Sequence, residues 1–149
     1  MELFRITLTK WADKLVASGK AARWNSKGIE MLYFAQSASL ACLENTVHKS
    51  AVELKNNFFS LSTVQAPDDF EEISEKKLPI GWNVIDPFVT PPCRPIGDKW
   101  IRGNSSLLLR VPSVIVRGEY NFLVNPKHPH FGKLKIIDKI PFLFDKRIK

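Results

Sequence analysis

The amino-acid sequence predicts a single α+β domain with a mixed, mostly antiparallel sheet, and three observations carry that prediction. The 149 residues match the length of one domain and can bury a sizeable core. Short apolar or β-branched runs of strand length recur along the chain, and most of them lie in its second half. One helical pattern follows an early apolar run, which is typical of an α+β arrangement. The expected domain spans residues 1–149.

The first half of the chain is expected to supply three strands and one helix. Residues 3–7 predict an opening strand, and a polar helical or turn segment follows at 11–18. Residues 31–35 are a compact apolar run of strand length. Ser37 or Ser39 can cap a helix that ends near Ser50, because a serine hydroxyl accepts from the free amides of a first turn. Residues 57–64 predict the third strand.

The second half is expected to be rich in strands. Residues 78–95 contain several prolines and predict a loop, after which a helix can run from Ile96 until Gly103 stops it. Beyond that helix, further strands are predicted at 107–111, 114–116 and 121–124, and one or two final strands at 133–145.

Glu44 is the first functional candidate. On a helical wheel, Leu40, Leu43 and Val47 form an apolar stripe, and Glu44 falls inside it with His48 at its edge. A carboxylate on a core-facing stripe is rare unless it is paired or lines a cleft. Glu44 is therefore either a cleft residue or the buried partner of an arginine.

Composition narrows the function classes. The net charge of +7 is scattered along the chain, which describes a basic surface but does not establish nucleic-acid binding. No apolar run is long enough to span a membrane, and the N-terminus has no secretion signal, so a cytoplasmic protein is expected. Of the two cysteines, Cys42 is expected to be a buried free thiol. His128 and His130 have no further ligand at metal-binding spacing, so no metal site is expected. Glycine-rich phosphate loops and serine-hydrolase elbows are missing, which argues against a serine hydrolase.

An ordered set of short motifs resembles the RES-domain family, which is named for its arginine, glutamate and serine. The set runs through nearly the whole chain and comprises Arg23-Trp24-Asn25-x-x-Gly28, Tyr33-x-Ala35, Ala41-x-x-Glu44, Gly97-Asp98-x-Trp100, Val111-Pro112-Ser113 and Asn121-x-x-x-Asn125-Pro126. Each fragment is weak alone, whereas their order is specific. The chain departs from the family at Ala21-Ala22, where two glycines are common, and alanine restricts the backbone of a ligand-binding loop more than glycine does.

The resemblance implies a fold similar to that of ADP-ribosyltransferases and a toxin that consumes NAD as its substrate, with inorganic phosphate as a possible co-substrate. It places Arg23, Tyr33, Glu44 and Ser113 at catalytic positions. Contacts to NAD are expected from Arg5, Arg23, Trp24, Asn25, Tyr33 and Asn125. Taken alone, the same residues fit structural roles: an arginine stacked on Trp24, a core tyrosine, and a turn serine at Ser113.

The chemistry of nicotinamide release fits these residue types. Breaking the nicotinamide–ribose bond builds positive charge on the sugar, which a carboxylate such as Glu44 can stabilise. Arg23 can bind pyrophosphate or an attacking phosphate, Tyr33 offers an aromatic face, and Ser113 can orient a hydroxyl or amide.

Three functions remain open at this point. The first is NAD phosphorolysis, the second is transfer of ADP-ribose to a protein, and the third is a non-catalytic basic binding module. The family resemblance also implies an Xre-like helix-turn-helix antitoxin as a partner, and a homodimer of this chain.

Overall fold

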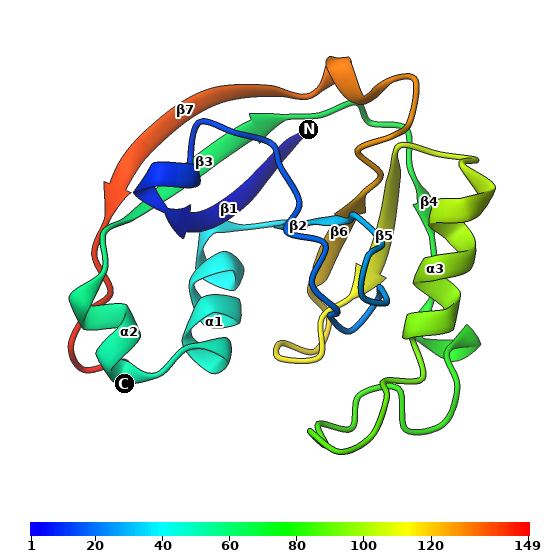
Figure 1. Ribbon diagram of the computed structural model, residues 1–149, viewed down its shortest axis with the longest axis horizontal. Helices are drawn as coiled ribbons and strands as arrows, with labels where there is room; N and C mark the ends of the chain where they lie inside the picture. Colours follow the sequence, from blue (N-terminus) through cyan, green and yellow to red (C-terminus); the bar gives the residue numbers. More distant parts are fainter.

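The computed structural model describes residues 1–149 and contains one seven-stranded sheet in the order β4-β5-β6-β2-β1-β3-β7. Three α-helices accompany it, with α1 and α2 beneath the β1–β3 half and α3 beside the other half (Figure 1). The strands are β1 Glu2–Leu8, β2 Leu32–Ala35, β3 Phe59–Gln65, β4 Glu71–Glu72, β5 Leu108–Pro112, β6 Tyr120–Val124 and β7 Lys135–Phe142. The α-helices are α1 Ala38–His48, α2 Ala51–Asn56 and α3 Arg94–Gly103, and single 3-10 turns lie at Thr9–Trp11, Glu75–Lys77 and Phe131–Lys133.

The sheet is mixed and mostly antiparallel, as the sequence predicts. Only β4 and β5 run parallel. β1 pairs with β3 along its whole length, but it meets β2 at a single residue pair, Phe4 opposite Ala35. β1 and β2 therefore separate on one side of that pair, and the sheet consists of two halves with a split between them.

The two faces of the sheet have separate cores. Leu32 and Phe34 of β2 point to one face, where they pack in a cluster with Phe122 and other buried residues. Tyr33 and Ala35 alternate with them and point to the opposite face. On that second face the apolar side chains form two clusters, one beneath α1 and the other beneath α3, which leaves room for a cleft between the clusters.

Helix α1 begins where the sequence predicts but faces the sheet with a different side. The Ser37 hydroxyl accepts from the Leu40 amide and caps the helix. Leu40 is fully buried, whereas Leu43 and Val47 are 38% and 50% exposed, so the predicted apolar stripe is wrong. Leu40, Ala41 and Thr46 are the buried residues of the helix, and Asn45 donates to the Ile6 carbonyl of β1.

Helix α3 starts two residues earlier and ends one residue later than predicted. Pro95 lies in the first turn, where a missing amide costs no helical hydrogen bond. Gly103 belongs to the helix, and Asn104 ends it with a left-handed backbone at φ 51°.

Residues 114–116 are not a strand, contrary to prediction. They form bends, because the Ser113 hydroxyl accepts from the Ile115 and Val116 amides and closes a turn after β5. The last segment forms one strand, β7, and its Pro141 is tolerated because β7 is an edge strand. None of the helices has the length and apolar character that crossing a membrane requires.

Candidate active-site cleft

A cleft of about 560 Å³ lies at the split between β1 and β2. Its size is within the usual range for small-molecule sites. It is lined by segments that are distant in sequence: β1 with the end of β2, the 21–24 loop, α1, the turn after β5, Ile85 of the 79–92 loop and Asn121 of β6. Among its lining residues are Arg5, Arg23, Trp24, Tyr33, Glu44, His48, Lys49, Pro112, Val114 and Asn121.

Arg23 is half-buried and fixed at the cleft wall. Its Nη1 donates to the Trp82 carbonyl at 2.7 Å. The Trp82 side chain is itself buried beside Cys93, whose thiol pKa is raised by burial to about 11. Cys93 is therefore a neutral thiol at physiological pH, and it offers no negative charge to Arg23. A backbone oxygen positions Arg23, and the rest of its guanidinium group is available to the cleft.

The loop that carries Arg23 is held by α3, through residues that the family motif contains. Gly97 lies against the Trp24 carbonyl so closely that a Cβ at Gly97 would be 1.9 Å from that oxygen. The buried Asp98 accepts from the Ser26 amide at 2.8 Å and from the Ser26 hydroxyl. These residues position the loop, a role that the sequence prediction did not assign to them.

Ala21 and Ala22 occupy ordinary backbone conformations. Among non-glycine residues only Asn104 has a positive φ, so neither alanine stands where glycine is needed. Arg94 of α3 donates to the Ala22 carbonyl at 2.9 Å and holds this part of the loop. Both alanines line the cleft, and the departure from the family pattern is therefore accommodated without backbone strain.

Tyr33 joins β2 to the Arg23 loop. Its hydroxyl donates to Asn25 Oδ1 at 2.6 Å and accepts from the Trp24 amide at 3.2 Å. The ring lines the cleft, on the face of β2 opposite to the one to which Leu32 points. Burial raises the pKa of the Tyr33 phenol above its usual range, despite the opposing effect of the Trp24 amide.

This pKa shift predicts that Tyr33 does not ionise in the folded protein between about pH 9 and pH 11. A raised folded pKa means that its contribution to stability is complete below the unfolded tyrosine pKa and is lost as pH rises through the folded value. Ultraviolet difference titrations of the wild type and of Tyr33→Phe should therefore show the same phenolate signal while both remain folded. An extra phenolate from the wild type in this range would contradict the shift.

Glu44 lies on the cleft side of α1, with about a quarter of its side chain exposed. Its Oε1 accepts from Asn121 Nδ2 at 2.6 Å, and its Oε2 is 3.6 Å from His48 Nε2. No arginine contacts it, so the alternative of a buried arginine partner is wrong. Asn121, on β6, was not among the predicted site residues.

Arg5 is a second arginine in the cleft, and it comes from β1. Burial lowers the pKa of its guanidinium, which lies 5.8 Å from the Phe34 ring centroid. Its one hydrogen bond, to the Val16 carbonyl, is long at 3.4 Å. A half-buried cation with so little protein bonding is suited to an anionic ligand.

Ser113 is placed just behind the cleft. It is buried, and its hydroxyl accepts from two amides of the following turn, while its neighbours Pro112 and Val114 line the cleft. The hydroxyl hydrogen is still available to donate. Ser113 thus has the turn role that its sequence context suggests, and it orients the chain segment that forms one wall.

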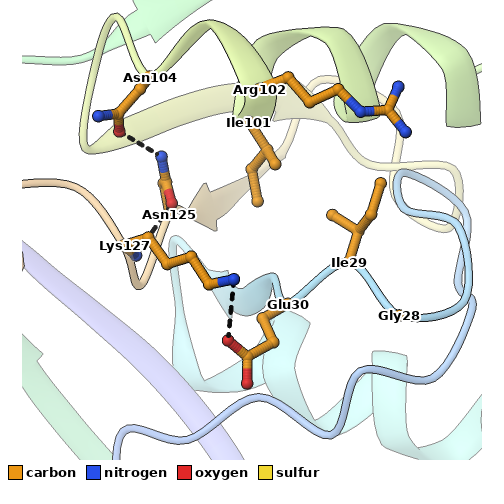
Figure 2. A pocket seen from close by; sticks show the side chains of 8 residues that line it. All are labelled: Gly28, Ile29, Glu30, Ile101, Arg102, Asn104, Asn125 and Lys127. Atoms are coloured by element: carbon orange, nitrogen blue, oxygen red, sulfur yellow. Dashed lines mark hydrogen bonds and ion pairs between the residues drawn. The ribbon is translucent and has the colours of Figure 1, made fainter.

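Asn25 and Asn125 do not line the cleft. Asn25 is 2% exposed, and its amide nitrogen donates to three loop carbonyls, those of Lys20, Ser26 and Ile29. Asn125 lies at a separate pocket of about 250 Å³ and its amide donates to Asn104 Oδ1 at 2.8 Å. Figure 2 shows this pocket and the bond between the two asparagines. The structure therefore brings together Arg5, Arg23, Trp24, Tyr33 and Glu44, with Ser113 behind them.

The cleft combines several basic groups with one carboxylate. Arg5, Arg23, His48 and Lys49 line it, and Glu44 is its only acidic residue. Such a site can bind a ligand with anionic groups on one part and a developing cation on another. It can support cleavage of a glycosidic bond in a molecule that also carries phosphates.

Comparison with known proteins identifies the family. The RES domain model matches residues 2–145. The chain is 35% identical to the "Prs ADP-ribosylating toxin" of Sphingobium sp. strain YBL2, covering 92% of this chain and 88% of that protein. It is 32% identical to "Toxin Res" of Yersinia enterocolitica, over the full length of both.

A solved structure supports the fold. The M. tuberculosis MbcT–MbcA toxin–antitoxin complex contains a chain that aligns with a TM-score of 0.73 over 95% of this chain and 84% of that one. The sequence identity is 16%, so this likeness concerns the fold alone.

Proposed function

This chain belongs to the RES domain family, and from that premise we propose that it is the toxin of a type II toxin–antitoxin pair that degrades NAD by phosphorolysis. The observation that carries the proposal is the meeting of Arg23, Tyr33 and Glu44 in one cleft at the split of the sheet. Two relatives of similar length are named as toxins, which supports the toxin assignment.

In the proposed reaction, the bond between nicotinamide nitrogen and ribose C1 breaks, and its electron pair stays on the nitrogen. A phosphate oxygen then forms a new bond to C1, which yields nicotinamide and a phosphorylated ADP-ribose. Glu44 stabilises the positive charge on the sugar in the transition state. Because its carboxylate is already held by Asn121, little reorganisation is needed at that moment.

The basic side chains of the cleft are suited to bind the anionic groups of the two substrates, NAD and phosphate. Arg23 of the 21–24 loop and Arg5 of β1 both line the cleft and are suited to the pyrophosphate of NAD, since a guanidinium group can bind two phosphate oxygens at once. Lys49 lies at the end of α1 and lines the cleft, and its ammonium group leaves positive charge available for a second anion. This surplus favours phosphate as the co-substrate. Ser113 is proposed to orient a substrate hydroxyl or amide through its free hydrogen.

Transfer of ADP-ribose to a protein is the second candidate, because one relative at 35% identity is named an ADP-ribosylating toxin. NAD labelled on the adenylate separates the two reactions. In phosphate buffer, phosphorolysis gives a soluble phosphorylated ADP-ribose and leaves protein unlabelled, whereas transfer fixes label on a protein target. If removal of phosphate leaves nicotinamide release unchanged, the phosphorolysis proposal fails.

We also propose an Xre-like helix-turn-helix antitoxin as the partner, with a homodimer of this chain in the complex, acting in the cytoplasm where NAD is abundant. The structurally similar chain comes from a toxin–antitoxin complex, which supports the antitoxin. One segment next to the cleft carries exposed apolar side chains. In the 79–92 loop these are Ile80, Val84, Ile85, Phe88 and Val89, and Ile85 also lines the cleft. Exposed apolar side chains beside a site are suited to burial by a partner. Co-purification with a neighbouring gene product tests the antitoxin, and light scattering tests the dimer.

A further inference from the structure

The Glu44 carboxylate is held by a side chain from a distant part of the chain. Asn121 Nδ2 donates to Glu44 Oε1 at 2.6 Å, across 77 residues of sequence. The other oxygen, Oε2, faces His48 Nε2 at 3.6 Å, but the His48 side chain is 72% exposed. Asn121 is therefore both the nearer and the less exposed of these two neighbours of the carboxylate.

The sheet fixes the backbone of Asn121, whereas the helix backbone leaves the side chain of Glu44 free to rotate. The backbone of Asn121 lies between two strands, opposite Ala35 of β2 and Val111 of β5. Glu44 stands on the cleft side of α1 with three rotatable side-chain bonds, and restricting such a side chain costs conformational entropy. A donor on the rigid strand therefore restricts the rotamer of a mobile carboxylate.

The Asn121 amide makes no other side-chain hydrogen bond, and Asn121 lines the cleft. Asn45, the other asparagine in the cleft, instead donates to two backbone carbonyls and supports the fold of α1. The single bond of Asn121 is directed at the one carboxylate of the site.

We propose that Asn121 is a positioning residue for NAD cleavage, which holds Glu44 in the rotamer that faces the ribose. The proposal rests on the proposed NAD cleavage by this cleft. Loss of the donor leaves the NAD-binding arginines in place and misdirects the carboxylate. We therefore expect kcat to fall about 10- to 100-fold, the scale of small misplacements at a reacting centre, with little change in KM.

Two variants of Asn121 and one control test the proposal by steady-state nicotinamide release. Asn121→Ala removes the donor, and Asn121→Asp keeps the shape but replaces the donor with a second carboxylate. Gln36→Ala is the matched control, because Gln36 accepts from the neighbouring Tyr120 amide at the same junction of β2 and β6 and does not line the cleft. Both Asn121 variants should lose kcat, and Gln36→Ala should keep it.

A double-mutant cycle distinguishes a positioning role of Asn121 from an independent one. If Asn121 acts through Glu44, the effects of mutating the two residues are not additive. In a Glu44→Ala background, Asn121→Ala should cause no further loss of NAD cleavage. A further loss as large as in the wild type, an unchanged kcat in Asn121→Asp, or an effect on KM alone would each overturn the proposal. If the wild type itself releases no nicotinamide, the proposed function fails, which is a different result from any of these.

Discussion

Replacement of Glu44 by glutamine is expected to reduce NAD cleavage at least about 100-fold, the effect typical of losing one group that stabilises transition-state charge. Glutamine keeps the size of the side chain and an oxygen that can still accept from Asn121. No arginine is left unpaired by the change, because the polar partners of the Glu44 carboxylate are Asn121 and His48. The melting temperature should therefore stay close to that of the wild type, as measured by circular dichroism.

A matched control is Glu30→Gln, which removes a carboxylate from the separate pocket where Glu30 lies 3.9 Å from Lys127 (Figure 2). This variant should keep the wild-type rate of nicotinamide release. Should Glu44→Gln melt far below the wild type while its folded fraction retains cleavage, Glu44 is structural and its assignment to the reaction is incorrect.

Gly97→Ala is expected to cause the largest loss of stability. The new Cβ would lie 1.9 Å from the Trp24 carbonyl oxygen. Because a Cβ and a carbonyl oxygen cannot rotate away from their backbones, α3 and the Arg23 loop must separate. Overpacking of this kind costs about 1–3 kcal/mol or more. For a domain of this size, about 1–3 kcal/mol corresponds to a fall in melting temperature of roughly 2–12 °C. NAD cleavage should fall as well, since the displaced loop carries Arg23.

Gly103→Ala provides the comparison within the same helix. Nothing lies within 4 Å of the position that its Cβ would take, and its φ is not positive. Alanine also favours a helix more than glycine does, so this variant should be as stable as the wild type or slightly more so. Equal melting temperatures for Gly97→Ala and the wild type would show that α3 does not hold the loop as described.

Local signals were sufficient to predict most of the strands and the start of α1. The apolar run before Gln36 and the capping serine at Ser37 are both readable within a few residues. Helix α2 was not predicted, although its capping box, Ser50 with Glu53, was visible in the sequence. The predicted helix end near Ser50 is in fact the junction between two helices.

The side of α1 that faces the sheet could not be read from hydrophobicity alone. Leu40 and Ala41 are buried against residues from β1, β2, α2 and β3, and these long-range contacts depend on how the strands pass the helix. Glu44 nevertheless lines a cleft, which was one of the two alternatives predicted for it, although the apolar stripe used to predict it was wrong.

The site depends on contacts between residues far apart in sequence. The family resemblance predicted Arg23, Tyr33 and Glu44 as residues of one site, and in the structure all three line one cleft. Asn121 and Asp98 were present in the family motifs, but motif order does not say which side chain contacts which. Their roles appear only when β6 reaches α1 and when α3 packs against the Arg23 loop.

The most direct test is nicotinamide release from NAD by the purified chain, freed of any bound partner, in the presence of inorganic phosphate. We expect release that depends on phosphate, yields one soluble phosphorylated ADP-ribose for each nicotinamide, and disappears with Glu44→Gln. A folded wild-type protein that releases no nicotinamide, with phosphate or without it, would contradict the assignment of this cleft as an NAD-cleaving site.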